Sequence, residues 1–129
     1  MHLSFPALVT ILALALYIAI FLNVGRLRRR FAIEAPAING PPEFERALRI
    51  QHNTIEQLIW FLPALWLFAL FASPLWGGVL GLVWIGARAF YAYSYARDPA
   101  TRAPGFAVAF FSAVILLVGA LVGAIASLI

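Results

Sequence analysis

The chain has 129 residues, of which 64% are hydrophobic and 11% charged, and its formal net charge is +4. Soluble domains average about 50% apolar and about 25% charged residues, so this composition excludes a soluble globular protein. Cysteine is absent, which excludes a disulfide framework and a cysteine nucleophile. The only two histidines, His2 and His52, are not at ligand spacing, and we therefore expect no metal site.

Four apolar stretches are long enough to cross a bilayer, whose hydrocarbon core takes about 20 helical residues. We expect helices over residues 3–24, 43–72, 75–96 and 106–129. Too few residues remain outside them to fold as a second domain, so residues 1–129 form one domain. The sequence thus predicts an all-α membrane protein, a four-transmembrane-helix bundle.

The connections between these helices follow from local signals. The first stretch has no basic n-region and is followed by arginines, so we expect it to stay as a spanning helix instead of being cleaved as a signal peptide. Three prolines and a glycine within residues 34–42 prevent a helix from continuing there. Pro63 predicts a kink in the second helix, and the third should end before Pro99.

Charged side chains are confined to residues 26–56 and 88–102. With four spans, the first and third loops lie on one side of the membrane, and the positive-inside rule predicts that this side is cytoplasmic. Both termini are then non-cytoplasmic. We expect a multi-pass protein of a bacterial inner membrane, or of the endoplasmic reticulum if the source is eukaryotic.

A polar stripe runs along the second expected helix. It consists of Arg46, Arg49, Asn53 and Glu56, which fall within about 80° of one helix face. Ionisable groups at membrane depth cost several kcal/mol unless they are paired or solvated, and they are functional candidates. One interpretation is an internal ion pair of Arg46 or Arg49 with Glu45 or Glu56, and the other is a binding site.

A second stripe lies on the third expected helix, where Arg88, Tyr91 and Tyr95 are spaced at i, i+3 and i+7. The tyrosines are also compatible with an aromatic belt at the membrane interface. If the two stripes meet, the site would suit a small zwitterionic polyanion whose attached group or cosubstrate is lipophilic. Periodicity alone leaves both interpretations open.

A longer pattern includes both stripes. It consists of Gly40-Pro41-Pro42-Glu43-Phe44-Glu45-Arg46 followed by Arg49, Gln51, Asn53 and Glu56, and of Arg88-x-x-Tyr91-x-x-x-Tyr95 followed by Arg97 and Arg102. This pattern resembles the signature of the membrane-associated proteins in eicosanoid and glutathione metabolism (MAPEG) family. It is most similar to the branch that holds leukotriene C synthase and the second microsomal glutathione transferase.

The resemblance implies a homotrimer of four-helix subunits, with one glutathione in each cleft between adjacent subunits near the cytoplasmic face. By position, the implied glutathione contacts are Arg28, Arg49, Gln51, Asn53, Glu56, Tyr91 and Tyr95. Arg102 would match the catalytic arginine that stabilises the thiolate, with Arg97 as the competing candidate. Arg29 would match a second catalytic arginine, placed towards the lipophilic substrate. Gln57 stands where the eicosanoid enzymes tend to have tyrosine, which leaves one glutathione contact open.

The implied activity is that of a microsomal-type glutathione transferase, which conjugates the glutathione thiolate to lipophilic electrophiles in detoxification. Reduction of lipid hydroperoxides is a second candidate reaction. The implied partners are glutathione as cosubstrate, the electrophile or hydroperoxide, membrane lipid and further copies of the chain, without metal or nucleic acid.

The main alternative is a non-catalytic lipid-binding or scaffolding membrane trimer. The family's lipid-presenting member, the five-lipoxygenase-activating protein, lacks an arginine that corresponds to Arg49, so Arg49 favours a catalyst. A small four-helix multidrug exporter is disfavoured, because that class places a carboxylate in its first helix and residues 3–24 contain none.

Overall fold

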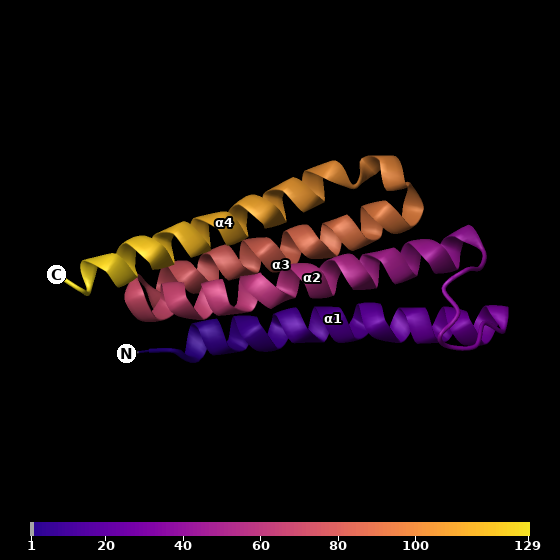
Figure 1. The fold of residues 1–129 in the computed structure, drawn as a ribbon, viewed down its shortest axis with the longest axis horizontal. Coiled ribbons are helices and arrows are strands. Elements are labelled where there is room, and N and C mark those ends of the chain that lie inside the picture. Colours follow the sequence, from indigo (N-terminus) through magenta and orange to yellow (C-terminus); the bar gives the residue numbers. More distant parts are fainter. Residues whose placement is uncertain (1) are drawn as a thin grey trace.

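The computed structural model describes residues 2–129 and consists of four long helices. They are α1 (Ser4–Phe31), α2 (Pro42–Phe71), α3 (Pro74–Arg97) and α4 (Ala103–Ala126), with a turn of 3₁₀ helix, η1 (Pro99–Thr101), before α4. All four are long and apolar enough to cross a membrane, which confirms the expected all-helical, four-span architecture. Both termini lie at one end of the bundle, and the α1–α2 and α3–α4 connections lie at the other (Figure 1). We call the latter the loop end.

The helix bounds differ most from expectation at the end of the first helix and at both ends of the fourth, which ends at Ala126 instead of residue 129. The first helix does not stop at residue 24 but continues to Phe31, because arginine is a good helix former and three basic residues in the last turn favour the helix C-terminus. It ends at Ala32, which adopts a left-handed conformation with φ of 54°. The fourth helix begins at Ala103 instead of residue 106, since Pro104 fits the first turn of a helix.

The second helix starts as the sequence predicts. Pro42 occupies its first turn, and Glu43 and Glu45 place negative charge near the positive end of the helix dipole. The helix continues through Pro63 to Phe71, and the kink expected at Pro63 stays a prediction. The first turns of α2 precede its apolar span, and they carry several of the polar residues that line the cavity described below.

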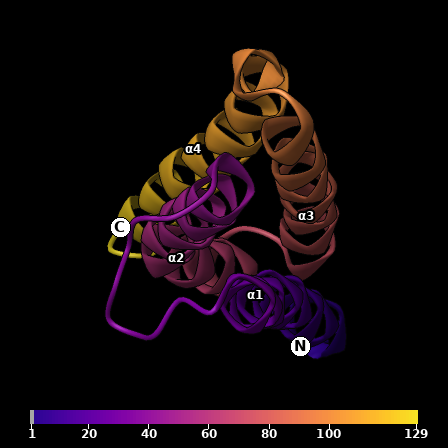
Figure 2. The same ribbon diagram turned by 90° about the vertical axis from the view of Figure 1, so that its right-hand side faces the viewer.

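Two of the four helices lie at the centre of the bundle. Viewed from the loop end, α2 and α3 lie between α1 and α4, and the α1–α2 loop extends on the side of α2 that faces away from α3 (Figure 2). In the core, the rings of Phe61 and Trp84 stack with centroids 3.9 Å apart and join α2 to α3. Large apolar side chains on the outer faces of all four helices are exposed in the single chain, as expected for contact with lipid or further subunits.

One close approach holds the start of α4 against α3. A Cβ atom added at Gly105 would lie 2.8 Å from the backbone nitrogen of Tyr91 and 3.0 Å from the carbonyl oxygen of Ala87. Only glycine allows the two backbones to come this close. Gly105 therefore fixes the position of the α3 face that carries Tyr91.

The Gly105→Ala variant is expected to lose about 1–3 kcal/mol of unfolding free energy, because the methyl group forces two backbones apart. The matched control is Gly86→Ala, since an added Cβ at Gly86 meets nothing within 4 Å and alanine is about 1 kcal/mol better than glycine in a helix. Thermal unfolding in detergent micelles measures both. Equal shifts in the two variants would contradict the close contact.

Candidate functional site

A cavity of about 580 Å³ lies at the loop end, on the outer face of α2. Its walls come from the α1–α2 loop, α2, α3 and the connection before α4: Ile38, Asn39, Glu45, Leu48, Arg49, His52, Asn53, Glu56, Tyr91, Tyr95 and Arg102. The volume is within the range of about 300–1,000 Å³ that is typical of small-molecule sites. We call this the α2 cavity.

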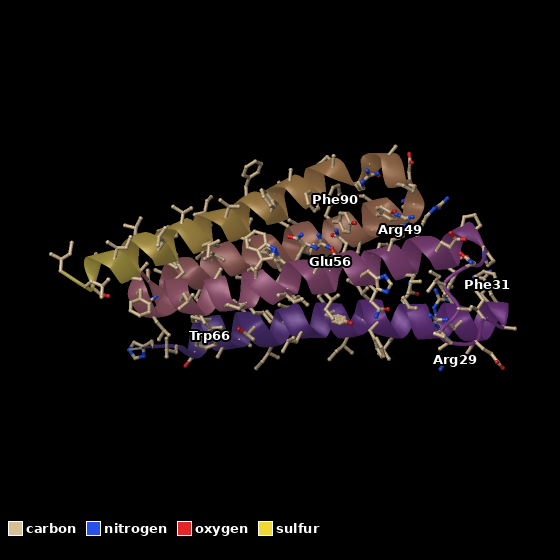
Figure 3. The ribbon with its side chains drawn as sticks, in the orientation of Figure 1. Arg29, Phe31, Arg49, Glu56, Trp66 and Phe90 are labelled. Carbon is tan, nitrogen blue, oxygen red and sulfur yellow. The ribbon has the colours of Figure 1, made fainter. Side chains whose placement is uncertain are left out.

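One face of α2 supplies the charged wall. Glu45, Arg49, His52 and Glu56 follow one another at helical spacing, and all four are exposed in the single chain. Figure 3 shows Arg49 and Glu56 along α2, with Arg49 nearer to the loop end. The internal ion pair considered above is not formed, because the one ion pair within residues 2–129 joins Arg30 to Glu43 at 3.5 Å. Both signs of charge therefore stay available to a ligand.

Arg46 lies off this wall, although the sequence places it on the same stripe. Its guanidinium donates a hydrogen bond of 3.2 Å to the carbonyl oxygen of Ala96, which joins α2 to the end of α3. Arg46 thus helps to hold the two helices whose polar residues face the cavity.

The opposite wall consists of aromatic side chains from α3. Tyr91 is buried, and its ring packs against Tyr95 with centroids 5.7 Å apart and against Phe106 of α4 at 6.3 Å. Packing on both sides restricts the Tyr91 ring to one orientation at the cavity edge. Both tyrosines thus line the α2 cavity.

Arg97, at the end of α3, and Arg102, in the connection that follows, point in different directions. Arg102 lines the α2 cavity, and its guanidinium also donates a hydrogen bond of 3.1 Å to the carbonyl oxygen of Pro99. Arg97 instead contacts the Tyr93 hydroxyl, with its guanidinium carbon 5.2 Å from the exposed Tyr93 ring. The Asp98 carboxylate accepts a hydrogen bond of 3.0 Å from the backbone of Ala100 and so shapes the turn that leads to Arg102.

Six of the implied site residues line the cavity together: Arg49, Asn53, Glu56, Tyr91, Tyr95 and Arg102. Three others do not. Gln51 donates a hydrogen bond of 3.4 Å to the Tyr17 hydroxyl, and Arg28 donates one of 2.8 Å to the carbonyl oxygen of Ala37. Arg29 lies on α1, away from Arg49 (Figure 3), in a separate groove of about 610 Å³.

Sequence reasoning missed several cavity residues. His52 follows Arg49 by three positions, so helical spacing could have placed it on the same face. Ile38 and Asn39 belong to the α1–α2 loop, where no periodicity exists to indicate their direction. Within residues 2–129 there is no group of three His, Cys, Asp or Glu side chains that could hold a metal ion.

The residues that form the cavity fall inside a region that matches a family model. Residues 6–122 match the model of the MAPEG family. The chain belongs to this family. The match confirms the resemblance seen in the sequence, and four long apolar helices fit a multi-pass membrane protein of the MAPEG type.

Several MAPEG relatives are similar over most of the chain. An uncharacterized protein of Synechocystis sp. is 47% identical over 120 residues, which cover 93% of this chain and 88% of the relative. Human microsomal glutathione S-transferase 2 is 35% identical over 101 residues, with coverages of 78% and 69%. Bovine leukotriene C4 synthase is 39% identical over 104 residues, with coverages of 80% and 69%.

Proposed function

We propose that this MAPEG protein is an integral-membrane glutathione transferase. It binds glutathione in the α2 cavity, activates it as the thiolate and conjugates it to lipophilic electrophiles, with reduction of lipid hydroperoxides as a second reaction. The observation that carries the proposal is that six of the residues implied by the resemblance, from α2, α3 and the α3–α4 connection, line this one cavity.

The chemistry of the walls fits glutathione, which carries two carboxylates and one ammonium group. Arg49 is suited to pair with a carboxylate through two parallel hydrogen bonds, and Glu56 to accept the ammonium group. The side-chain oxygen of Asn53 is buried and has no hydrogen-bond partner among residues 2–129, so it is available as an acceptor. The hydroxyls of Tyr91 and Tyr95 bond the remaining polar atoms.

We assign to Arg102 the stabilisation of the glutathione thiolate. A free thiol of pKa about 8.5 is only about 3% ionised at pH 7, and lowering its pKa by about two units makes it about 75% ionised. This shift costs about 2.7 kcal/mol, and an arginine at about 4 Å supplies about 4 kcal/mol at an effective dielectric constant of 20.

Ionisation alone gives a small gain in rate. A lower thiol pKa also weakens the nucleophile, and a Brønsted slope near 0.45 leaves about threefold of the roughly 25-fold increase in thiolate. Most of the acceleration therefore comes from holding the sulfur next to the electrophile, where effective molarity is large. The sulfur forms a bond to the electrophilic carbon while the bond to the leaving atom breaks.

The residues outside the cavity support a homotrimer in which adjacent subunits share each site. Three residues do not line the cavity of their own chain: Gln51, Arg28 and Arg29. The glutathione contacts that the resemblance implies for them would therefore be made in the cavity of an adjacent subunit. The charged face of α2 is also exposed in the single chain. Both features fit a cleft that a second subunit closes.

Cross-linking in mild detergent is expected to proceed to a trimer and to stop there, because a closed ring leaves no further interface. The stoichiometry should be one glutathione for each subunit. A monodisperse monomer that binds glutathione as tightly as the cross-linked species would contradict the shared site.

The arginines set the proposed orientation. Those of the α1 end and of the α3–α4 connection lie at the loop end, which the positive-inside rule assigns to the cytoplasm, and both termini are then non-cytoplasmic. In this orientation the cavity receives glutathione from the cytoplasm, while its apolar surroundings receive the second substrate from the membrane of a bacterium or of the endoplasmic reticulum.

The decisive experiment measures glutathione binding and turnover of the purified protein in detergent. A generic aryl halide and a fatty-acid hydroperoxide serve as parallel second substrates, and the thiolate absorbance reports activation. Binding with conjugation supports the transferase. Lipid binding without a thiolate signal or turnover would favour a non-catalytic lipid-binding trimer.

A further inference from the structure

A third arginine lies beneath the wall of the α2 cavity. Arg88 is on α3, within the apolar part of the bundle, and its exposed fraction is 0%. It does not line the cavity, but Tyr91, one turn further along α3, does. The position of Arg88 places a full positive charge inside the protein, behind the aromatic wall.

Two contacts hold the Arg88 side chain. Its guanidinium donates a hydrogen bond of 2.9 Å to the Thr54 hydroxyl, which itself donates one of 2.7 Å to the carbonyl oxygen of Ile50. The guanidinium carbon also lies 4.2 Å from the centroid of the Tyr91 ring, in cation–π geometry. Arg88 therefore links α2, next to Asn53, to the aromatic wall of α3.

The rest of the guanidinium is not compensated. Its Nε and Nη1 atoms are buried and have no hydrogen-bond partner among residues 2–129. No carboxylate lies within 4 Å, since the one ion pair in this part of the chain is that of Arg30 and Glu43. A neighbouring subunit has no access to Arg88, because its own chain already covers it completely.

Such an arrangement is unfavourable for folding. A buried, unpaired charge destabilises a protein, and replacing it by an apolar side chain of similar volume is neutral or stabilising. The cost is higher at membrane depth, where ionisable groups are rare and functional. The stability of the bundle therefore gives no reason for an arginine at position 88.

We propose that Arg88 is a positioning residue of the glutathione site, which holds the Tyr91 ring against the cavity and keeps it in register with Asn53. This proposal rests on the proposed function. The planar guanidinium orients the ring from behind through its face, and the hydrogen bond to Thr54 fixes the distance between the two helices. Lysine lacks this planar fork and cannot stack in the same way.

The test compares Arg88→Met with the wild-type protein in detergent, because methionine fills similar space without charge. The thermal unfolding midpoint is expected to stay equal or to rise. The glutathione KM is expected to rise about 10- to 100-fold, the factor for a lost hydrogen bond to a charged ligand, because Tyr91 is released. Turnover at saturating glutathione should stay within about threefold, since Arg102 still stabilises the sulfur.

Two further variants complete the design. Arg88→Lys keeps the positive charge but lacks the planar guanidinium group. Its glutathione KM should stay within about threefold of that of Arg88→Met. Arg26→Met is the control, since it removes an arginine at the loop end that bonds to Asn23 within α1 and does not line the α2 cavity, and its KM should be that of the wild type.

The outcomes distinguish a positioning role of Arg88 from a purely structural role. A lower unfolding midpoint or a misfolded Arg88→Met protein would show a structural role and overturn the proposal, as would an unchanged KM. Full recovery by Arg88→Lys would also overturn it, because charge alone would then suffice. If the wild-type protein itself bound no glutathione, the proposed function would fail and this proposal with it.

Discussion

Replacement of Arg102 by alanine is expected to abolish the thiolate absorbance that appears when glutathione is added, with little change in glutathione affinity. The thiolate fraction at pH 7 should fall from about 75% to about 3%, the value of a free thiol. Turnover at saturating glutathione should fall by at least about threefold at this pH. The cause is the loss of the guanidinium that the structure places at the cavity wall.

The pH dependence of the thiolate signal and of turnover provides a second test of the role of Arg102. With Arg102 present, the bound thiol has a lowered pKa, so the thiolate and the turnover persist down to about pH 6.5. Without Arg102, ionisation requires a pH near 8.5, and turnover should rise as the pH is raised towards that value.

Arg97→Ala is the control, because Arg97 contacts Tyr93 and does not line the cavity. It should keep the thiolate signal and full turnover. If Arg97→Ala lost both the thiolate signal and turnover while Arg102→Ala kept both, Arg97 would be the arginine that stabilises the thiolate. The mechanism of an arginine-stabilised thiolate would still hold. If neither variant changed the signal, a lipid-binding protein would be the better account.

The helices could be predicted because their physical cause is local. A bilayer of fixed thickness sets the length of an apolar span, and composition alone reveals four of them. The end of α1 could not be placed by the same argument, since residues 25–31 are too polar for the membrane core but still favour a helix. Hydropathy locates the membrane, whereas helix propensity and proline locate the helix ends.

Within one helix, spacing also predicted which site residues share a face. Arg49, Asn53 and Glu56 line the cavity together, as the 3.6-residue period of α2 requires. The helical period does not indicate how side chains of different helices face one another. The direction of Gln51 depends on Tyr17 of α1, and that of Arg102 on the turn at Asp98, so neither could be derived from the sequence.

Arg88 shows a further limit of sequence reasoning. Its spacing to Tyr91 and Tyr95 was visible, but periodicity left open whether this stripe faces a ligand or belongs to an interfacial aromatic belt. In the structure, the tyrosines line the cavity but Arg88 turns into the bundle towards Thr54. Residues on one helix face need not reach the same space, because a neighbouring helix decides which of them it covers.

Replacement of Arg49 by alanine is expected to raise the glutathione KM about 10- to 100-fold, which is the factor for a lost charge-assisted hydrogen bond of about 1.5–3 kcal/mol. The turnover number should stay within about threefold. Arg49 is proposed to hold a carboxylate that takes no part in the reaction, so the contact is equally strong in the ground state and the transition state. Initial rates over a range of glutathione concentrations measure both constants.

Two variants define what Arg49 contributes. Arg26→Ala removes the same charge at the loop end, but Arg26 bonds to Asn23 within α1 and does not line the α2 cavity, so its KM should be unchanged. Arg49→Lys keeps the charge but loses the bidentate fork, and its KM should lie between those of the wild type and Arg49→Ala.

Arg49 and Arg102 have different proposed roles at this site. Arg49 is exposed on α2 in the single chain, whereas Arg102 comes from the connection between α3 and α4. An arginine that only anchors the ligand alters KM, and one that stabilises developing charge on sulfur alters turnover. A fall in turnover with unchanged KM in Arg49→Ala would show that Arg49 lies at the sulfur, and the orientation of glutathione in the cavity would then be reversed.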